Sequence, residues 1–197
     1  IIVNDLGGSV DGSGGSSESA EQVVKEIIGL GGQAIPNGSS VTDDKGVKLM
    51  IDQAMDEFGR IDILINNAGI LPEPEELTDI TVECMLDAYK INCVAPIFLS
   101  KHFLPLLKKA SKIYKYKDVM SIDKACIVHI SSDWGSFHER EMSECGSLYP
   151  YRCSKIALNM AMKNLSIDLK EDEILVTAIH PGWVSRFIMR MLNFNFS

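Results

Sequence analysis

The sequence predicts an α/β fold in which helices cover both faces of a parallel sheet. Short segments rich in Ile, Val and Leu alternate with longer stretches that carry apolar side chains at helical spacing. Strands that alternate with helices form βαβ units, and such units build parallel sheets. The chain shows no internal repeat and no linker, so we expect one domain over residues 1–197.

The predicted strands are short and contain many β-branched residues. They cover residues 1–6, 33–36, 61–65, 125–130 and 174–179. Gly7-Gly8 ends the first strand, and the third runs directly into Asn66-Asn67-Ala68-Gly69. The last strand closes at His180-Pro181-Gly182.

Four helices are predicted between these strands. Residues 18–30 form the first, which Gly31-Gly32 ends, and Asp43 or Asp44 caps the second, which Gly59 ends. A long helix over 81–107 is expected to bend or divide near Pro96 and Pro105, and the last covers 151–169. Residues 108–124 carry six lysines and little periodicity, which predicts a solvated loop or frayed helix end, with a basic binding patch as the weaker alternative.

Composition narrows the class of protein. Apolar residues make up 46% of the chain, enough for a core, and the formal net charge of −8 argues against a nucleic-acid partner. The five cysteines are scattered without a C-x-x-C pair, so we expect reduced thiols, no zinc or other metal site, and a cytosolic or organellar location. No secretory signal and no apolar run of membrane-spanning length is present, so no membrane partner is expected.

Tyr151 and Lys155 are the strongest candidates for chemistry. Residues four apart on a helix share one face, and a lysine ammonium beside a phenol lowers the pKa of that phenol. Such a tyrosine can exchange a proton with a carbonyl oxygen, which a hydroxyl of Ser131 or Ser132 could hold. The alternative is a helical tyrosine and lysine without a joint task.

Several motifs occur in a fixed order along the chain. Asn66-Asn67-Ala68-Gly69 follows a strand, Asn92 follows about one helix later, and Ser132 follows the next strand. Tyr151 with Lys155 and then Pro181-Gly182 complete the series. With these motifs the chain, from Ile1 to about Val184, resembles the short-chain dehydrogenase/reductase family. The resemblance implies a Rossmann-type doubly wound sheet and hydride transfer between NAD(P) and a secondary alcohol or carbonyl substrate.

The resemblance also implies roles for four catalytic residues. Tyr151 would be the general acid/base, and Lys155 would lower its pKa and hold the nicotinamide ribose. Ser132 would orient the substrate carbonyl, with Ser131 as the alternative, and Asn92 would hold a water in the proton path.

Further residues are implied to bind the cofactor. Asn67, Ala68 and Gly69 would line the adenosine side, and Pro181 and Gly182 would lie against the nicotinamide. Tyr151 and Lys155 belong to this set as well.

Asp5 bears on the choice of cofactor. An acidic side chain at this strand end accepts hydrogen bonds from the ribose hydroxyls and repels a 2′-phosphate, so NAD is expected, with NADP as the alternative. The competing interpretation is that Asp5 only caps a loop. Val41 falls beside the adenine, where Ser40 replaces an acidic residue common in the family.

The two halves of the chain resemble different branches of the family. Residues 1–71 are similar to the NAD-linked dehydrogenase domain of peroxisomal multifunctional β-oxidation enzymes, a hydroxyacyl-CoA dehydrogenase. The part from Val128 onward is similar to sniffer-type carbonyl reductases, which generally use NADPH. We expect a cytoplasmic location, with the peroxisome as the alternative, and a homodimer or homotetramer of the full-length protein, formed through the long helices.

One family element cannot be found. Three βα units normally precede the Asn-Asn-Ala-Gly strand, and only two are present, so the first unit with its glycine-rich phosphate turn is lacking. Gly12-Ser13-Gly14-Gly15 does not replace it, because Ser17 stands at the third glycine position. The absent strand is central, so the strands at Ile1 and Ile61 would have no neighbour between them.

The chain also ends at Ser197, before the usual substrate lobe, and Ser185 and Arg186 stand where a nicotinamide-binding threonine is usual. We therefore expect a fragment of a longer enzyme. The alternative function is that of an inactive truncated relative that serves as a binding or regulatory module.

Overall fold

The structure, a computed structural model, describes residues 1–7, 18–72, 76–113, 120–137 and 148–182. Its strands are β1 (Ile2–Asn4), β2 (Ile35–Asn37), β3 (Ile63–Asn66), β4 (Cys126–Ile130) and β5 (Leu175–Ile179). β1 pairs with β2, β3 with β4 and β4 with β5, and every pair is parallel. The five predicted strands and their parallel direction are confirmed.

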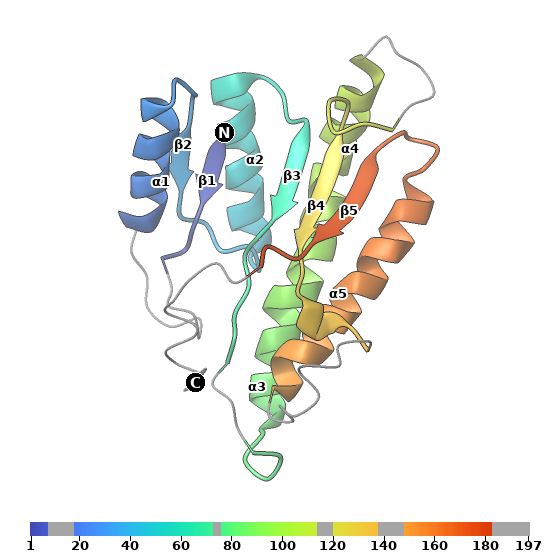
Figure 1. The fold of residues 1–197 in the computed structure, drawn as a ribbon. Coiled ribbons are helices and arrows are strands. Elements are labelled where there is room, and N and C mark those ends of the chain that lie inside the picture. Colours follow the sequence, from blue (N-terminus) through green and yellow to red (C-terminus); the bar gives the residue numbers. More distant parts are fainter. Residues whose placement is uncertain (8–17, 73–75, 114–119, 138–147, 183–197) are drawn as a thin grey trace.

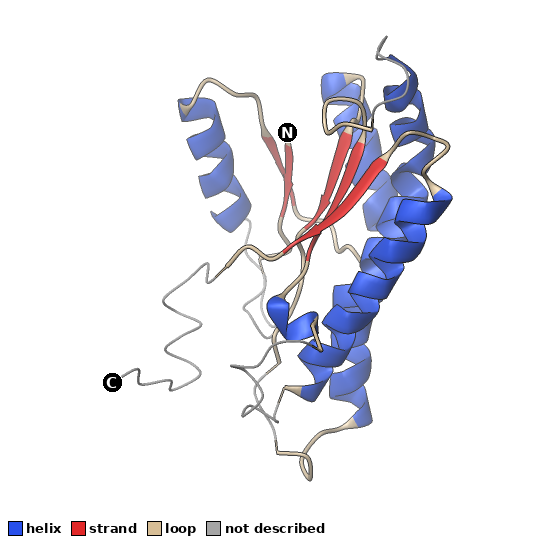
Figure 2. Ribbon diagram, turned by 45° about the vertical axis from the view of Figure 1, so that its right-hand side comes forward, coloured by secondary structure: helices blue, strands red, loops and turns tan. Residues whose placement is uncertain are grey.

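The helices alternate with these strands as predicted. They are α1 (Glu18–Gly29), α2 (Asp44–Phe58), α3 (Val82–Tyr89), α4 (Ala95–Ile113) and α5 (Tyr149–Asp168). Figure 2 shows α1 on one side of the strands, with α2, α4 and α5 on the other. The sheet is thus sandwiched between helices where α1 lies over β1 and β2.

Local sequence signals set the ends of α2. The Asp43 side chain accepts a hydrogen bond from the Gly46 N–H at 2.9 Å, which makes Asp43 the N-cap. Gly59 follows the helix with φ of 70°, the left-handed conformation that glycine adopts without steric cost. Both predicted ends of this helix are confirmed, with Asp43 chosen over Asp44.

The predicted long helix divides at one of the two expected places. A π-helical turn, Lys90–Val94, joins α3 to α4, whereas α4 continues through Pro105 without a break. Pro96 lies two residues beyond that turn, and because proline has no N–H, the helix gives up one backbone hydrogen bond there. The expected interruption near Pro96 is therefore present, and the one at Pro105 is not.

The lysine-rich segment is more ordered than predicted. Residues 108–113 belong to α4, where Lys108 forms an ion pair with Asp172 at 2.8 Å. Lys124 is buried and its ammonium lies 2.5 Å from a carboxylate oxygen of Glu173. Of the two predicted alternatives, the helix end describes residues 108–113, and the solvated loop is wrong for Lys124, which is buried against the turn that precedes β5. Residues 114–119 lie outside the described part of the chain.

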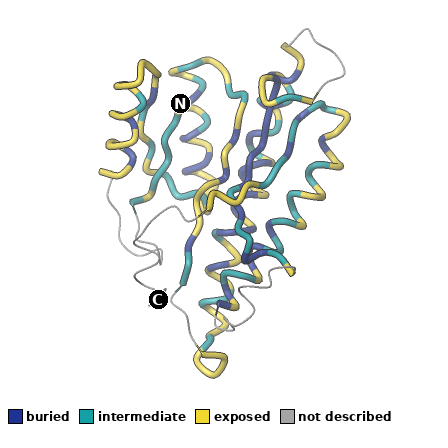
Figure 3. Tube along the Cα trace, viewed as in Figure 1, coloured by how far each residue is buried: buried dark blue, intermediate teal, exposed yellow. Residues whose placement is uncertain are grey.

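The hydrophobic core lies between β3, β4 and β5 and the helices on one side of them. Leu107 of α4, Ile127 of β4 and Ile174 are fully buried at its centre. Figure 3 shows buried positions along β4 and on the inner sides of these helices. This packing holds the carboxyl ends of β3, β4 and β5 in fixed positions beside the start of α5.

The strands fall into two sheets, one of β1 and β2 and one of β3, β4 and β5. β1 and β3 share no ladder, and a cavity of about 660 Å³ separates them. Ile2, Val3 and Val41 line one side of it, and β3 lines the other, with Ile63 44% and Ile65 59% exposed. Among the residues that the structure describes, no strand lies between β1 and β3, as predicted.

Candidate active site

The candidate residues gather where the strands end and α5 begins (Figure 1). Tyr151 lies in the first turn of α5, and Lys155 follows one turn later. The Lys155 side chain points back toward the sheet, where its Nζ donates a hydrogen bond to the Ile130 carbonyl at 2.8 Å. The same Nζ lies 5.5 Å from the centre of the Tyr151 ring. The predicted pair therefore shares one face of α5, anchored to the end of β4.

Lys155 is only 4% exposed. Burial penalises its charged form and lowers the pKa of the ammonium from 10.5 to about 8. Below about pH 8, Lys155 is protonated in the folded protein, and burying its charge lowers the free energy of unfolding. This loss shrinks as the pH rises toward 10.5, the pKa of the lysine in the unfolded chain. Between these values the unfolded chain binds more protons, so this group makes the protein more stable as the pH rises.

Lys155→Met removes this dependence on pH. Between pH 7 and pH 10, the wild type should gain about 2 kcal/mol of unfolding free energy relative to the variant. Urea unfolding of both proteins at the two pH values measures the change. Because the two proteins share all other titrating groups, the contribution of those groups cancels in the difference between them. A difference that stays constant with pH would show that the pKa of Lys155 is not depressed.

The two neighbouring serines have different surroundings. The Ser131 hydroxyl is buried and donates to Asn159 Oδ1 at 2.6 Å, 28 positions along the chain. The Ser132 hydroxyl accepts the Trp134 N–H at 3.2 Å and forms a hydrogen bond with Tyr151. The geometry thus favours Ser132 over Ser131 as the partner of Tyr151, because the Ser131 hydroxyl is bonded to Asn159 of α5 and the Ser132 hydroxyl contacts the phenol.

The sequence predicts a lowered pKa for Tyr151, and the structure reverses the sign. Burial raises the pKa of the phenol above 10, the hydrogen bond from Ser132 lowers it, and the charge of Asp133 raises it. The Lys155 ammonium donates its hydrogen bond to the Ile130 carbonyl and not to the phenol, so it does not offset the rise in the Tyr151 pKa that burial causes. Tyr151 is therefore protonated at neutral pH in this structure.

Asn92 lies in the π-helical turn and is fully buried. Its Oδ1 accepts from the Ile70 N–H at 2.8 Å, and its Nδ2 donates to the Ile70 carbonyl at 2.9 Å and to Ser154 Oγ at 3.0 Å. This side chain ties the segment after β3 to α5. The role in a proton path stays a prediction, since the side-chain amide is occupied by these bonds.

Gly69 lies where a side chain would be crowded. A Cβ at this position would meet Asn92 Oδ1 at 3.2 Å and Lys155 Nζ at 3.6 Å. The glycine lets the backbone after β3 approach both of these groups. The 3.2 Å approach to Asn92 Oδ1 is tighter than a usual Cβ contact, which explains why a residue without a side chain suits this position, whereas 3.6 Å to Lys155 is an ordinary contact.

Gly69→Ala should lower the unfolding free energy by about 1–2 kcal/mol, because the new methyl group displaces the Asn92 amide. Denaturant unfolding measures this change. Gly29→Ala is the matched control, since Gly29 ends α1 with open space around it and alanine is the better helix former. A loss at position 69 no larger than at position 29 would contradict the proposed crowding.

The predicted cofactor-binding residues lie at the same edge of the molecule, where the strands end (Figure 1). Asn67, Ala68 and Gly69 follow β3 and are exposed, and Asn67, Ala68 and Val41 border or line the cavity between the sheets. Pro181 and Gly182 follow β5 and are also exposed. The structure brings these groups to one edge, as the prediction requires.

Asp5 comes directly after β1, and its Oδ1 accepts from the Gly7 N–H at 2.7 Å. The loop-capping interpretation of this residue is therefore observed. It is compatible with a second role for the carboxylate, because one oxygen makes this bond. Gly12–Gly15, Ser185 and Arg186 lie outside the described residues.

Sequence reasoning did not assign functions to Trp134, which contacts Tyr151, or to His129, on which the charge of Lys155 acts. The Trp134 ring meets the Tyr151 ring edge-on, with centroids 6.0 Å apart and planes at 89°. His129 is buried on β4, its Nδ1 lies 3.2 Å from Asn66 Nδ2, and burial and the charge of Lys155 lower its pKa to about 4. A polar residue within an otherwise apolar strand is the signal that could have identified His129.

Other site classes find no support in the described part of the chain. No group of three His, Cys, Asp or Glu residues there could hold a metal ion. Cys84, Cys93, Cys126 and Cys153 are free thiols. Among the described helices, none combines the length and apolar character needed to cross a bilayer.

Comparison with known proteins agrees with the geometry. The sequence pattern of the short chain dehydrogenases matches residues 6–194. The chain is 30% identical to peroxisomal multifunctional enzyme A of Dictyostelium discoideum, in an alignment that covers 94% of this chain and 48% of that protein. It therefore spans about half the length of this relative.

Solved structures show the same fold. Carbonyl reductase Sniffer of D. melanogaster superimposes with a TM-score of 0.72 at 33% identity, over 85% of this chain and 66% of that one. The NADPH-bound carbonyl reductase from chicken fatty liver superimposes with a TM-score of 0.72 at 33% identity, over 82% of this chain and 63% of that one. The resemblance to both groups of relatives and the Rossmann-type fold are thereby confirmed.

Proposed function

Because the chain belongs to the short chain dehydrogenase family, we propose that it transfers hydride between NAD(P) and a secondary alcohol or carbonyl substrate. The observation that carries this proposal is the approach of Ser132 and Lys155 to Tyr151 at the carboxyl end of the sheet. That edge is where ligands bind in open α/β sheets.

The nicotinamide supplies or accepts the hydride when it is bound. The chain's own residues then act on the substrate oxygen. Ser132 donates a hydrogen bond that holds this oxygen, and Tyr151 delivers a proton to it during reduction or removes one during oxidation. The raised pKa of Tyr151 keeps the phenol protonated at neutral pH, which is the form that carbonyl reduction needs.

Lys155 would hold the nicotinamide ribose, with its ammonium fixed by the Ile130 carbonyl. Asn67, Ala68, Gly69 and Val41 would contact the adenosine side, and Pro181 and Gly182 the nicotinamide. Asp5 at the end of β1 favours NAD, because its charge would repel a 2′-phosphate. The solved chicken carbonyl reductase was bound to NADPH, so NADP is the alternative.

The long helices support the predicted assembly. Phe98 on α4 and Met160 on α5 are large apolar side chains that remain exposed in the single chain. We assign these faces to contacts with a second copy in a homodimer or homotetramer. A cytoplasmic location with a peroxisomal alternative remains part of the proposal, since curated relatives include peroxisomal enzymes.

Consumption of NADH or NADPH with a panel of uncharged ketones tests the reaction. We expect loss of nucleotide absorbance at about 340 nm that depends on the ketone and disappears in Tyr151→Phe. A correctly folded chain that oxidises neither nucleotide with any ketone would contradict the proposal.

A second candidate function is that of a non-catalytic binding module. The cavity between β1 and β3 favours it. The strand that carries the phosphate-binding turn of the family would lie in this place, and the described residues provide no such strand. Calorimetric titration with NADH separates the two functions. A folded chain that neither binds nor oxidises NADH supports the binding module.

A further inference from the structure

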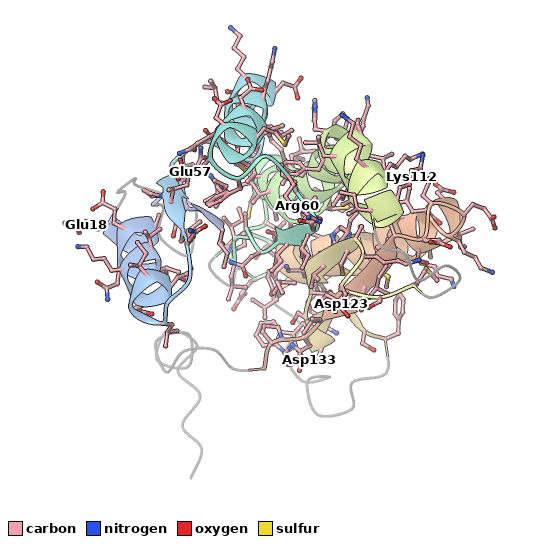
Figure 4. The ribbon with its side chains drawn as sticks, turned by 90° about the horizontal axis from the view of Figure 1, so that it is seen from above. Glu18, Glu57, Arg60, Lys112, Asp123 and Asp133 are labelled. Atoms are coloured by element: carbon pink, nitrogen blue, oxygen red, sulfur yellow. The ribbon has the colours of Figure 1, made fainter. Side chains whose placement is uncertain are left out.

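Asp133 is an acidic residue directly beside the proposed reaction centre. It follows Ser132 and begins the short 3₁₀ helix Asp133–Gly135, with its side chain 25% exposed. Figure 4 shows Asp133 on the opposite side of the sheet from α2. Neither the sequence motifs nor the roles assigned above account for a charge at this position.

The Asp133 carboxylate is held in place on both oxygens. Oδ1 accepts from the Ser132 hydroxyl at 3.0 Å and from the Trp134 N–H at 2.8 Å. Oδ2 lies 3.5 Å from His180 Nε2, while the Asp133 N–H donates to His180 Nδ1 at 3.4 Å. With Nδ1 as acceptor, the neutral imidazole carries its proton on Nε2, the ring nitrogen that lies nearer to Oδ2. His180 thus fixes Asp133 from the end of β5.

The Ser132 hydroxyl has one proton and two acceptors that compete for it. Asp133 Oδ1 takes it in the described geometry, and the Tyr151 oxygen is also within hydrogen-bonding reach. A substrate carbonyl held by Ser132 must therefore draw this proton away from Asp133. The carboxylate controls the direction in which the hydroxyl points before the substrate arrives.

The charge of Asp133 also acts on the phenol. It raises the pKa of Tyr151, whereas the hydrogen bond with Ser132 lowers it. Two charged groups act on Tyr151 from different elements: the Lys155 ammonium on the same helix lies 5.5 Å from the ring centre, and the Asp133 carboxylate acts on the phenol from the segment after β4. Of these, Asp133 is the one that carries a negative charge.

We propose that Asp133 is a positioning and specificity residue of this site, which orients the Ser132 hydroxyl and selects substrates that carry no negative charge beside the reacting carbon. The proposal rests on the proposed function, because Ser132 must contact the substrate oxygen. A substrate held there lies one hydroxyl away from the carboxylate. An anionic group on the neighbouring carbon meets like-charge repulsion at about 5–6 Å.

Asp133→Asn removes the charge and keeps the shape and an acceptor oxygen. Tyrosinate absorbance, followed as a function of pH and corrected with Tyr151→Phe in each background, reports the pKa of Tyr151 without any turnover. We expect the midpoint of Tyr151 to fall by half a pH unit or more, about a threefold change in ionisation. An unchanged midpoint would overturn the positioning role, whether or not the chain reduces ketones.

Asp123→Asn is the matched control. Asp123 also accepts from a nearby serine, Ser121, at 3.2 Å, but it lies in the exposed turn before β4 (Figure 4). Asp123→Asn therefore removes the same charge, and alters the same kind of serine–carboxylate hydrogen bond, at a distance from the site. The control should leave the Tyr151 midpoint in place, and an equal shift in both variants would count against a local effect of Asp133.

Steady-state reduction of ethyl acetoacetate and of acetoacetate then tests selectivity. Asp133→Asn should raise kcat/KM for the anionic acetoacetate about tenfold relative to the neutral ester, as expected for the loss of one charge at this distance. An unchanged ratio would overturn the specificity role. Failure of the wild type to reduce either ketone would instead contradict the proposed function, and the tyrosinate titration would still decide the positioning role.

Discussion

Tyr151→Phe is expected to lower kcat for ketone reduction by at least about a thousandfold. The phenol is the proton donor of the proposed reaction, and phenylalanine retains the ring that packs against Trp134. Only the hydroxyl group and its hydrogen bond with Ser132 are lost. Binding of the nucleotide should change little, so the effect should appear in kcat and not in the affinity for NADH.

Tyr149→Phe provides the control for this variant. Tyr149 begins α5 two residues earlier and is 40% exposed, so it should tolerate the same change with kcat altered less than about twofold. Stopped-flow or steady-state absorbance of the reduced nucleotide measures both variants. A Tyr151→Phe protein that retains more than a tenth of the wild-type kcat would remove Tyr151 from the role of general acid.

Asn92→Leu should cost about 3–5 kcal/mol of unfolding free energy. The substitution leaves the buried N–H and carbonyl of Ile70 without the amide that binds both, and it removes the partner of the Ser154 hydroxyl. Leucine adds no hydrogen bond in return. The start of α5 should loosen with it, because the amide joins that helix to the segment after β3.

Denaturant unfolding with the linear extrapolation method measures this loss. Asn164→Leu is the control, since Asn164 lies exposed on α5 and should change the stability by less than about 0.5 kcal/mol. If Asn92→Leu cost less than about 1 kcal/mol, then the three hydrogen bonds would not carry the structural role assigned to them.

Local signals in the sequence predict much of this fold. Alternating β-branched segments and helical stripes identify the five described strands and the segments that form α1, α2, α3 with α4, and α5, but not the 3₁₀ helix Asp133–Gly135. Asp43 and Gly59 mark the ends of α2 where they were expected. These features depend on residues close together in the chain. For the same reason, the four-residue spacing of Tyr151 and Lys155 is enough to place both side chains on one face of a helix.

Features that depend on tertiary contacts could not be predicted. Ser131 and Ser132 differ because Asn159 binds the first of them, and that partner is 28 residues away. The pKa of Tyr151 rises because the surrounding elements bury the phenol, which the spacing of Tyr151 and Lys155 does not reveal. Lys124 resembles a surface lysine until Glu173 is brought beside it.

The separation of β1 from β3 has a consequence for how the molecule opens. No backbone hydrogen bonds between these strands transmit cooperativity, so α1, β1 and β2 can detach locally while β3, β4 and β5 remain paired. Ile2 and Val41, which pack against the core, provide part of the attachment that remains. Native-state hydrogen exchange should therefore resolve two sub-globular units. The boundary between them runs beside Asp5 and Asn67, so any ligand that spans these two residues would join the units and stabilise both.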